Sequence, residues 1–432
     1  MIKKKGRRLK VLVTAHEISP ILGSECLSGW NVLTRLGFFH DLVILYAESN
    51  QFGTQKYKEQ IENYLLKTRQ FPSIEFIAIP QPYLTKIIAK INKIISSKKT
   101  SVGLSFLYFL GVKIWEKRVF MFVSKIIKER HFDIIHHFNH LSFREPGYLW
   151  KIDVPFIWGP MSGLSRVPMS FLSSMPLGEI LYNTLRNFLN NYQHFVNRRI
   201  TKAIKKSKLI YFVTTDDGSF IKGKNCRTKN LLDMGGNEVV KYKNKLSQSD
   251  LIKILWVGRF SYLKALDLLL RAIDSSDILR KHLQINIVGD GPQKKYYQNI
   301  AFDLKLLNIN WLGQIPKDQV LRNMRESDVL VHTSIKEAAS AVILESLSAG
   351  LPVVCHDSFG MSFAINEKCG IKVPFISHKK SIEGFKIALE KICHNPDLIK
   401  ELSIGALLRA KELSWDSMAE IIANDYNDII GK

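Results

Sequence analysis

The chain contains few cysteines and no Asp-x-Asp pair. Its five cysteines, among 432 residues, are scattered, and no two of them form a Cys-x-x-Cys pair. Such a set is a poor disulfide framework and a poor zinc site, so a reducing compartment fits best. Asp-x-Asp would supply the paired carboxylates that hold a divalent ion on a diphosphate. Without it, we expect neither a metal nor a cofactor.

Long apolar runs are also missing. The longest, residues 102–112, is about half of the roughly 20 residues that a membrane-spanning helix needs. The basic N-terminus is followed by an apolar stretch that Lys10 interrupts, and no small-residue cleavage site follows. We therefore expect neither a secretory signal nor a membrane span.

The charge is large and unevenly distributed. The formal net charge is +23, from 62 Lys and Arg against 39 Asp and Glu. Residues 1–210 hold 32 basic and 13 acidic residues (+19), which leaves 30 and 26 (+4) for residues 211–432. This favours a phosphate-bearing partner or an anionic membrane surface for the first half.

Short apolar runs alternate with helical patterns along the whole chain. Nearly continuous apolar runs are typical of strands buried on both faces of a parallel sheet. The alternation predicts an α/β fold of two doubly wound, Rossmann-like domains facing a cleft, with ligands at the carboxyl ends of the strands. We place the domains at residues 1–220 and 221–432, and we expect a last helix, near 414–430 and capped by Ser414, to cross back to the first. The expected strands are Leu9–Ala15, Leu42–Ala47, Ile74–Ile79, Phe132–Phe138, Pro155–Trp158, Leu209–Thr215, Lys253–Val257, Gln284–Val288, Ile309–Leu312, Val329–His332 and Pro352–Cys355.

The segment Val331–Asp357 is the most informative. Glu337 falls in a loop before a predicted helix, and Glu345 falls on that helix after seven intervening residues. Small residues at the helix start allow backbone N–H groups to approach a phosphate closely. The alternative, a capping carboxylate followed by a solvated glutamate, has about equal weight from the spacing alone. The small residues that would face the phosphate are Ala339, Ser340 and Ala341.

This segment resembles the Glu-x7-Glu signature of the retaining glycosyltransferases of family four, which have the GT-B fold. Three further stretches, Trp256–Lys264, Ile287–Pro292 and Ile309–Pro316, resemble the loops that bind the nucleotide and its diphosphate in that family. The resemblance implies a nucleotide diphosphate sugar as donor substrate in the second domain, with an acceptor in the first. It implies donor binding by Gly258, Arg259, Lys264, Gly289, Gly313, Ala339, Ser340, Ala341 and Glu345.

The first half resembles a subset of the same family. Ile21–Trp30 is similar to its Gly-Ser-Glu loop, and Asp133–Glu145 and Pro155–Gly163 are similar to two of its later segments. The resemblance implies an acceptor-side loop and a histidine near the donor sugar. His136 and His137 are adjacent in a strand and cannot both face the cleft, and His140 follows. We slightly prefer His137, although a structural role is equally compatible. The acceptor-side residues are Gly23, Ser24, Glu25, His136 and Arg144.

The expected catalytic residues are Glu337, His137, Arg259 and Lys264. Fixed cations at Arg259 and Lys264 would stabilise the negative charge that a leaving nucleoside diphosphate gains. Glu337 would position the sugar and is not our choice for a covalent nucleophile. The family implies instead a front-face reaction in which the leaving phosphate deprotonates the acceptor. The chain departs from the pattern of this family directly after Glu337, where Ala-Ala-Ser replaces the usual glycine and aromatic residue.

Thr85–Lys99 predicts a basic amphipathic helix. Its isoleucines lie on one stripe with lysines around it, a pattern typical of helices in the membrane interface. A helix packed on the sheet with a solvated lysine face is the alternative reading.

We therefore expect a metal-independent retaining hexosyltransferase that acts in the cytoplasm on the inner face of the cell membrane. Its acceptor would be a lipid-linked saccharide or oligosaccharide in bacterial cell-surface polysaccharide synthesis, such as O-antigen, capsule or exopolysaccharide, and we expect no nucleic-acid partner. The alternative is a non-catalytic basic scaffold on the same fold that binds nucleic acid or anionic lipid.

Overall fold

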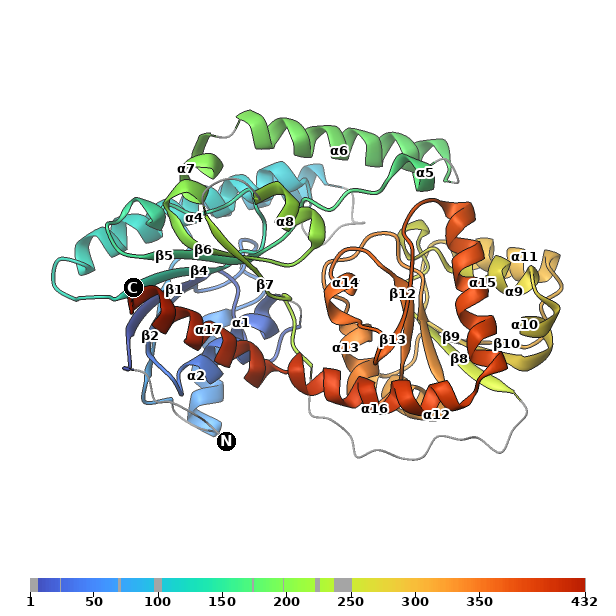
Figure 1. Ribbon diagram of the computed structural model, residues 1–432. Helices are drawn as coiled ribbons and strands as arrows, with labels where there is room; N and C mark the ends of the chain where they lie inside the picture. The colour runs from blue at the N-terminus through green and yellow to red at the C-terminus, as the bar shows by residue number, and fades with distance from the viewer. Residues whose placement is uncertain are drawn as a thin grey trace.

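The computed structural model describes residues 7–23, 25–68, 71–96, 103–172, 175–196, 198–221, 226–236 and 251–431. Within these ranges the chain forms two parallel sheets, each covered by helices on both faces (Figure 1). The first sheet has seven described strands in the order β3-β2-β1-β4-β5-β6-β7, and the second has six in the order β10-β9-β8-β11-β12-β13. The predicted fold of two doubly wound domains is confirmed.

The strands lie close to the predicted apolar runs, and two were not predicted. β7 and β13 are four-residue strands at sheet edges, too short and too polar to stand out in the sequence. Because β7 pairs with β6, the first sheet continues past residue 220. The strands are β1 (Lys10–Ala15), β2 (Asp41–Ala47), β3 (Ile74–Ile79), β4 (Ile134–Asn139), β5 (Phe156–Met161), β6 (Ser207–Phe212), β7 (Arg227–Asn230), β8 (Ile252–Val257), β9 (Leu283–Val288), β10 (Ile309–Gly313), β11 (Val329–His332), β12 (Val353–His356) and β13 (Gly370–Val373).

Helices connect successive strands, as parallel pairing requires. Those before the second sheet are α1 (Glu25–Leu36), α2 (Tyr57–Lys67), α3 (Tyr83–Ile95), α4 (Ser105–Ile126), η1 (Leu149–Lys151), α5 (Met169–Leu172), α6 (Leu177–Val196), α7 (Arg198–Lys206) and α8 (Thr215–Ile221). Those that follow β8 are η2 (Tyr262–Lys264), α9 (Leu266–Asp274), α10 (Asp277–His282), α11 (Lys294–Asp303), α12 (Lys317–Glu326), α13 (Ala341–Ser348), α14 (Met361–Ala364), α15 (His378–His394), α16 (Asp397–Glu412) and α17 (Trp415–Ile430).

The last helix, α17, packs on the first sheet although it follows the second domain in the chain (Figure 1). Its start is capped as expected, because the Ser414 hydroxyl accepts a hydrogen bond from the Ser417 N–H at 3.2 Å. The Asp425 carboxylate is buried and lies 2.9 Å from both the Tyr211 hydroxyl and the Lys229 ammonium. A buried carboxylate with charged and hydroxyl partners ties this helix to β6 and β7.

Replacing Asp425 should therefore loosen α17. We expect Asp425→Ala to lower the free energy of unfolding by about 2–4 kcal/mol, because it leaves the buried Tyr211 hydroxyl and nearby cations without their acceptor. Urea unfolding measures the loss, and amide hydrogen exchange should locate it in α17. Asp428→Ala is the matched control: its carboxylate is 60% exposed and should contribute less than about 1 kcal/mol. Equal losses in both variants would contradict this account.

Candidate functional site

Three loops at the carboxyl ends of β8, β9 and β10 are joined by backbone hydrogen bonds. The Gly258 N–H donates to the Val288 carbonyl at 3.0 Å, and the Gly289 N–H donates to the Gly313 carbonyl at 2.8 Å. Gly289 has a φ of +137°, and a Cβ there would lie 1.9 Å from the Gly258 carbonyl oxygen. Only glycine allows this close approach of two loops.

These loops line a cavity of about 730 Å³, a size suited to a nucleotide. Gly258, Arg259 and Gly289 line it, and Gly313 stands next to its lining residue Gln314. The Arg259 side chain is exposed at the cavity, and no ion pair with another described residue holds it. The structure thus places Gly258, Arg259 and Gly289 around one space, with Gly313 next to it in the chain.

Lys264 and Glu337 form an ion pair, and neither residue lines this cavity. Lys264 ends the 3-10 turn η2 after β8, whereas Glu337 follows β11, so the pair connects two neighbouring strand ends. The Ser334 hydroxyl donates to the same carboxylate at 3.0 Å, and His332 Nε2 lies 3.7 Å from it. Burial alone would raise the pKa of Glu337, but the interactions with His332 and Lys264 outweigh burial and lower it to about 2. Glu337 is consequently a fixed anion at neutral pH.

The start of α13 lies next to Glu337. Ser340 is the buried residue before the helix, and its hydroxyl makes no capping hydrogen bond there. Ala341 begins the helix. Glu345, one turn further, pairs with the Lys317 ammonium at 2.9 Å. The predicted donor residues therefore lie along one edge of the second sheet, and Glu345 has a cationic partner that the sequence did not predict.

The N–H of Ala339, which we expected to face a phosphate, donates to the Asp233 carboxylate at 3.2 Å. Asp233 lies in the segment between the two sheets, and its carbonyl accepts from the Ser28 hydroxyl of α1 at 2.6 Å. Burial, with some repulsion from Glu25, raises the pKa of Asp233 to about 7. No sequence signal pointed to this residue, because its position depends on how the two domains meet.

On the first domain, Glu25 and His140 meet at the carboxyl ends of β1 and β4. Glu25 begins α1, and its Oε2 lies 4.0 Å from His140 Nδ1. The His140 ring is also 3.2 Å from the Tyr108 hydroxyl, which donates to Glu17 at 2.6 Å. Gly23 lies in the loop before α1, and Ser24 lies outside the described residues.

His136 and His137 are both buried in the first domain. His136 contacts the Tyr426 hydroxyl and the Gly159 carbonyl, and His137 contacts the Thr14 hydroxyl at 2.8 Å and the Glu145 carbonyl at 3.0 Å. Burial lowers the pKa of both rings, to about 4 for His136 and about 3 for His137, and both are neutral. Adjacent strand residues pack into the two opposite layers of a covered sheet, and His140, after the strand, lies near Glu25. The choice of His137 as the histidine near the donor sugar stays a prediction.

Arg144 packs its guanidinium over the ring of Phe143, with its carbon 4.5 Å from the ring centre. Burial lowers its pKa to about 10. Among the described residues, no group of three or more His, Cys, Asp or Glu side chains is arranged to hold a metal ion.

Residues 240–409 match the profile of the family Glycosyl transferases group 1. The uncharacterized glycosyltransferase MJ1607 of Methanocaldococcus jannaschii is 24% identical over 245 residues, 55% of this chain and 61% of the relative. The D-inositol 3-phosphate glycosyltransferase of Streptomyces griseus is 27% identical over 202 residues, 44% of this chain and 42% of the relative. The chain therefore spans about half the length of these relatives.

Solved structures share the fold over nearly the whole chain. Sucrose-phosphate synthase of Thermosynechococcus elongatus has a TM-score of 0.60 at 13% identity, covering 98% of this chain and 100% of its own. The lipopolysaccharide outer core galactosyltransferase WaaB has a TM-score of 0.61 at 12% identity, covering 96% and 99%. Anabaena Alr3699/HepE in complex with UDP-glucose has a TM-score of 0.55 at 13% identity, covering 97% and 99%. The fold is GT-B.

The raised pKa of Asp233 predicts a pH dependence. The native state keeps this proton up to about pH 7, whereas an unfolded chain loses it near pH 4, so its contribution to stability is complete below pH 4 and falls as the pH rises to 7. Asp233→Asn keeps an acceptor for Ala339 and removes the titration. As the pH rises from 4 to 7, we expect the free energy of unfolding of the variant to increase relative to that of wild type by on the order of 2–4 kcal/mol, as measured by urea unfolding. Parallel pH profiles would contradict this expectation.

Proposed function

We propose that the protein is a retaining glycosyltransferase that moves a sugar from a nucleotide diphosphate sugar to a hydroxyl of an acceptor held by the first domain. The observation that carries this is the single row formed by the glycine-lined cavity, the Lys264–Glu337 pair and the start of α13. A nucleotide in the cavity would extend its diphosphate toward Arg259 and Lys264. The sugar would then lie against Glu337, between the domains.

Arg259, Lys264 and Glu337 have distinct roles in the proposed reaction. Arg259 and Lys264 neutralise the charge that appears on the diphosphate as the glycosidic bond breaks. Glu337, held ionised, accepts hydrogen bonds from sugar hydroxyls and stabilises positive charge at the anomeric carbon. In a front-face reaction the acceptor hydroxyl loses its proton to the leaving phosphate, so no protein nucleophile is required. Glu25 and His140 border the acceptor side.

Removing Lys264 should weaken nucleotide binding. We expect Lys264→Ala to raise the Kd for UDP by about tenfold or more, because a charged hydrogen bond to phosphate is lost. UDP is the first nucleotide to test, since the Anabaena protein of the same fold is known with UDP-glucose. Isothermal titration calorimetry gives the Kd, and Lys281→Ala, which removes an exposed lysine on α10, is the control.

The outcome also separates the two candidate functions. Failure of UDP, GDP and the other nucleoside diphosphates to bind wild-type protein, together with specific binding of DNA or RNA, would favour the basic scaffold. Release of UDP from UDP-sugars by wild type, lost in Lys264→Ala, would favour the enzyme.

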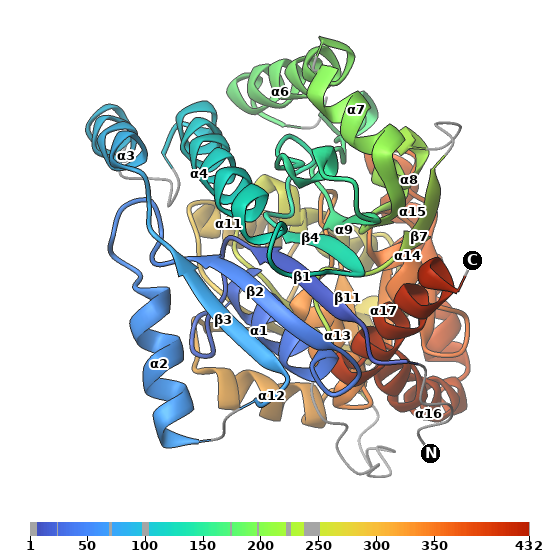
Figure 2. The ribbon, with the colours of Figure 1, turned by 90° about the vertical axis from the view of Figure 1, so that its left-hand side faces the viewer.

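The acceptor that we propose is a lipid-linked saccharide of bacterial cell-surface polysaccharide synthesis, reached at an anionic inner membrane surface. Support comes from α3 and α4, which pack side by side along one edge of the first domain (Figure 2). Tyr83, Ile94 and Phe106 on these helices are 80%, 83% and 66% exposed. Lys86, Lys90 and Lys93 on α3 are exposed as well, and Lys98 and Lys99 lie outside the described residues. None of the helices in the described ranges has the length and apolar character that crossing a bilayer requires.

Negative charge introduced among the exposed isoleucines of this face should release the protein from membranes. We expect Ile91→Glu/Ile94→Glu to reduce co-sedimentation with vesicles of phosphatidylglycerol and phosphatidylethanolamine by about tenfold, because apolar insertion is lost and anionic lipid is repelled. Ile387→Glu is the control, since Ile387 is 58% exposed on α15 of the second domain. Equal binding by all three proteins would contradict the membrane part of the proposal.

A further inference from the structure

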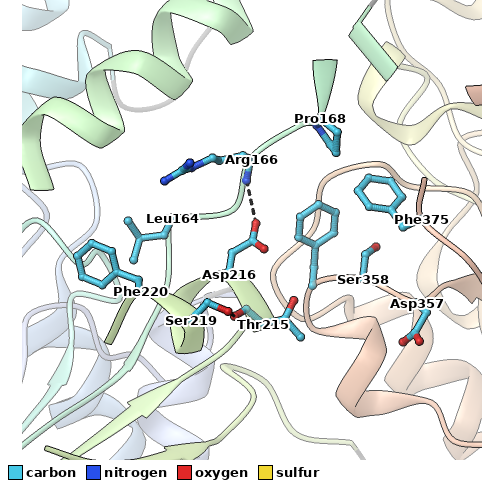
Figure 3. Close-up of a pocket in the computed structure, with 11 residues that line it drawn as sticks. Leu164, Arg166, Pro168, Thr215, Asp216, Ser219, Phe220, Asp357, Ser358 and Phe375 are labelled. Carbon is cyan, nitrogen blue, oxygen red and sulfur yellow. Dashed lines mark hydrogen bonds between the residues drawn. The ribbon is translucent and has the colours of Figure 1, made fainter. Parts of the chain in front are cut away.

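A second cavity, also of about 730 Å³, lies between the two domains (Figure 3). On the second domain it is lined by Asp357–Phe359 after β12 and by Phe375 after β13. Since the strand order is β10-β9-β8-β11-β12-β13, the nucleotide cavity and this one lie on opposite sides of Glu337, which follows β11. A molecule in the second cavity would reach the reacting centre from the side away from the nucleotide.

The second cavity is close to the reacting loop. Gly360 packs against the loop that follows Glu337, because a Cβ on Gly360 would lie 2.2 Å from the Ala338 carbonyl oxygen. The opposite wall consists of the segment after β5 and of α8, which follows β6. Both domains thus contribute to the cavity, as an acceptor site for transfer across the cleft requires.

The lining combines aromatic rings with hydroxyls and carboxylates. Phe220, Phe359 and Phe375 contribute rings, and Phe375 is held by stacking on Phe171 with centroids 4.4 Å apart. Asp216 is fixed by the Arg166 N–H, which donates to it at 3.1 Å (Figure 3). Sugars present C–H faces that pack on aromatic rings and hydroxyls that both donate and accept, so this lining suits a saccharide.

Ser358 indicates separately that the second cavity binds a ligand. Its side chain lines the cavity and the residue is only 7% exposed, yet its hydroxyl has no hydrogen-bond partner among the described residues. A buried hydroxyl without a partner is costly unless something else satisfies it. A ligand hydroxyl in the cavity would do so.

The charges disfavour a second phosphate site. Asp216 and Asp357 are both on the lining, and Asp357 pairs with Lys372 at 2.9 Å. Arg166, the cation on the lining, is exposed and points away from the second-domain wall (Figure 3). Carboxylates repel an anion and accept hydrogen bonds from hydroxyls, so a neutral, hydroxyl-rich ligand fits better.

We infer that this cavity binds a neutral sugar unit of the acceptor, next to the unit that is glycosylated. This inference rests on the proposed function. The enzyme would then select acceptors by a saccharide contact distant from the nucleotide. The occupant is a saccharide, because rings, carboxylates and an unsatisfied hydroxyl converge on one space between the domains.

The test uses wild-type protein saturated with UDP, so that the nucleotide cavity is filled. Saturation-transfer NMR is recorded with methyl glycosides of glucose, galactose, rhamnose and N-acetylglucosamine. Ser219→Trp fills the second cavity from an exposed position at its rim, where the fold tolerates a larger side chain. Phe302→Trp, on an 82% exposed site of α11, is the control for an added indole.

We expect at least one glycoside to bind wild type and Phe302→Trp, and its signal to fall by about fivefold or more in Ser219→Trp while the Kd for UDP stays unchanged. The inference is overturned if no glycoside binds, if UDP displaces the glycosides, or if Ser219→Trp leaves the signal intact. Failure of UDP itself to bind counts against the proposed function instead. In that case a glycoside signal abolished by Ser219→Trp would still support the saccharide site.

Discussion

The ion pair between Lys264 and Glu337 is the interaction on which the candidate site depends. It connects the loop after β8 to the loop after β11, two strands that are neighbours in the sheet but far apart in the chain. Both side chains are largely buried, so each charge requires the other. In the proposed function, the pair would place a cation and an ionised carboxylate within reach of one bound molecule. The two groups would then stabilise a departing diphosphate and a sugar that becomes positive.

The candidate site also requires that the two domains face each other. Three contacts between distant parts of the chain hold them in this orientation. α17 leaves the second domain and packs on the first sheet through Asp425 and Tyr426. Asp233 bridges α1 and the loop before α13. Phe171 of the first domain stacks on Phe375 of the second. Because the carboxyl ends of parallel strands are where loops and polar groups gather, this orientation places two sets of such loops on either side of one cleft.

The Asp233 contact also connects domain arrangement with ligand binding. Its carboxylate accepts a hydrogen bond from the Ala339 N–H, which would donate to a phosphate in the proposed function. The same residue is tied to α1 of the first domain, so a donor that takes over this N–H would change the contact between the domains. A raised pKa means that the competing group is neutral below about pH 7 and charged above it.

The pattern of apolar and small residues in adjacent positions was enough to predict most strands and the ordered motifs around Gly258, Gly289 and Glu337. A buried parallel strand needs a nearly continuous apolar run, and a loop that approaches a phosphate needs small residues, and both requirements are visible in adjacent residues. Edge strands β7 and β13 escaped because their few residues are not buried on both faces. The choice among His136, His137 and His140 could not be made from spacing, since it depends on which layer each ring enters.

The amino-acid sequence by itself thus determined the fold class and the edge of the second sheet along which the proposed donor-binding residues lie, because these follow from short-range patterns of apolar, small and charged residues. Only the tertiary structure decided that Glu337 pairs with Lys264, that Asp233 reaches the start of α13, and that a second cavity lies on the far side of Glu337. These depend on contacts between segments that are separated by tens to hundreds of residues, and such contacts leave no periodic signal along the chain.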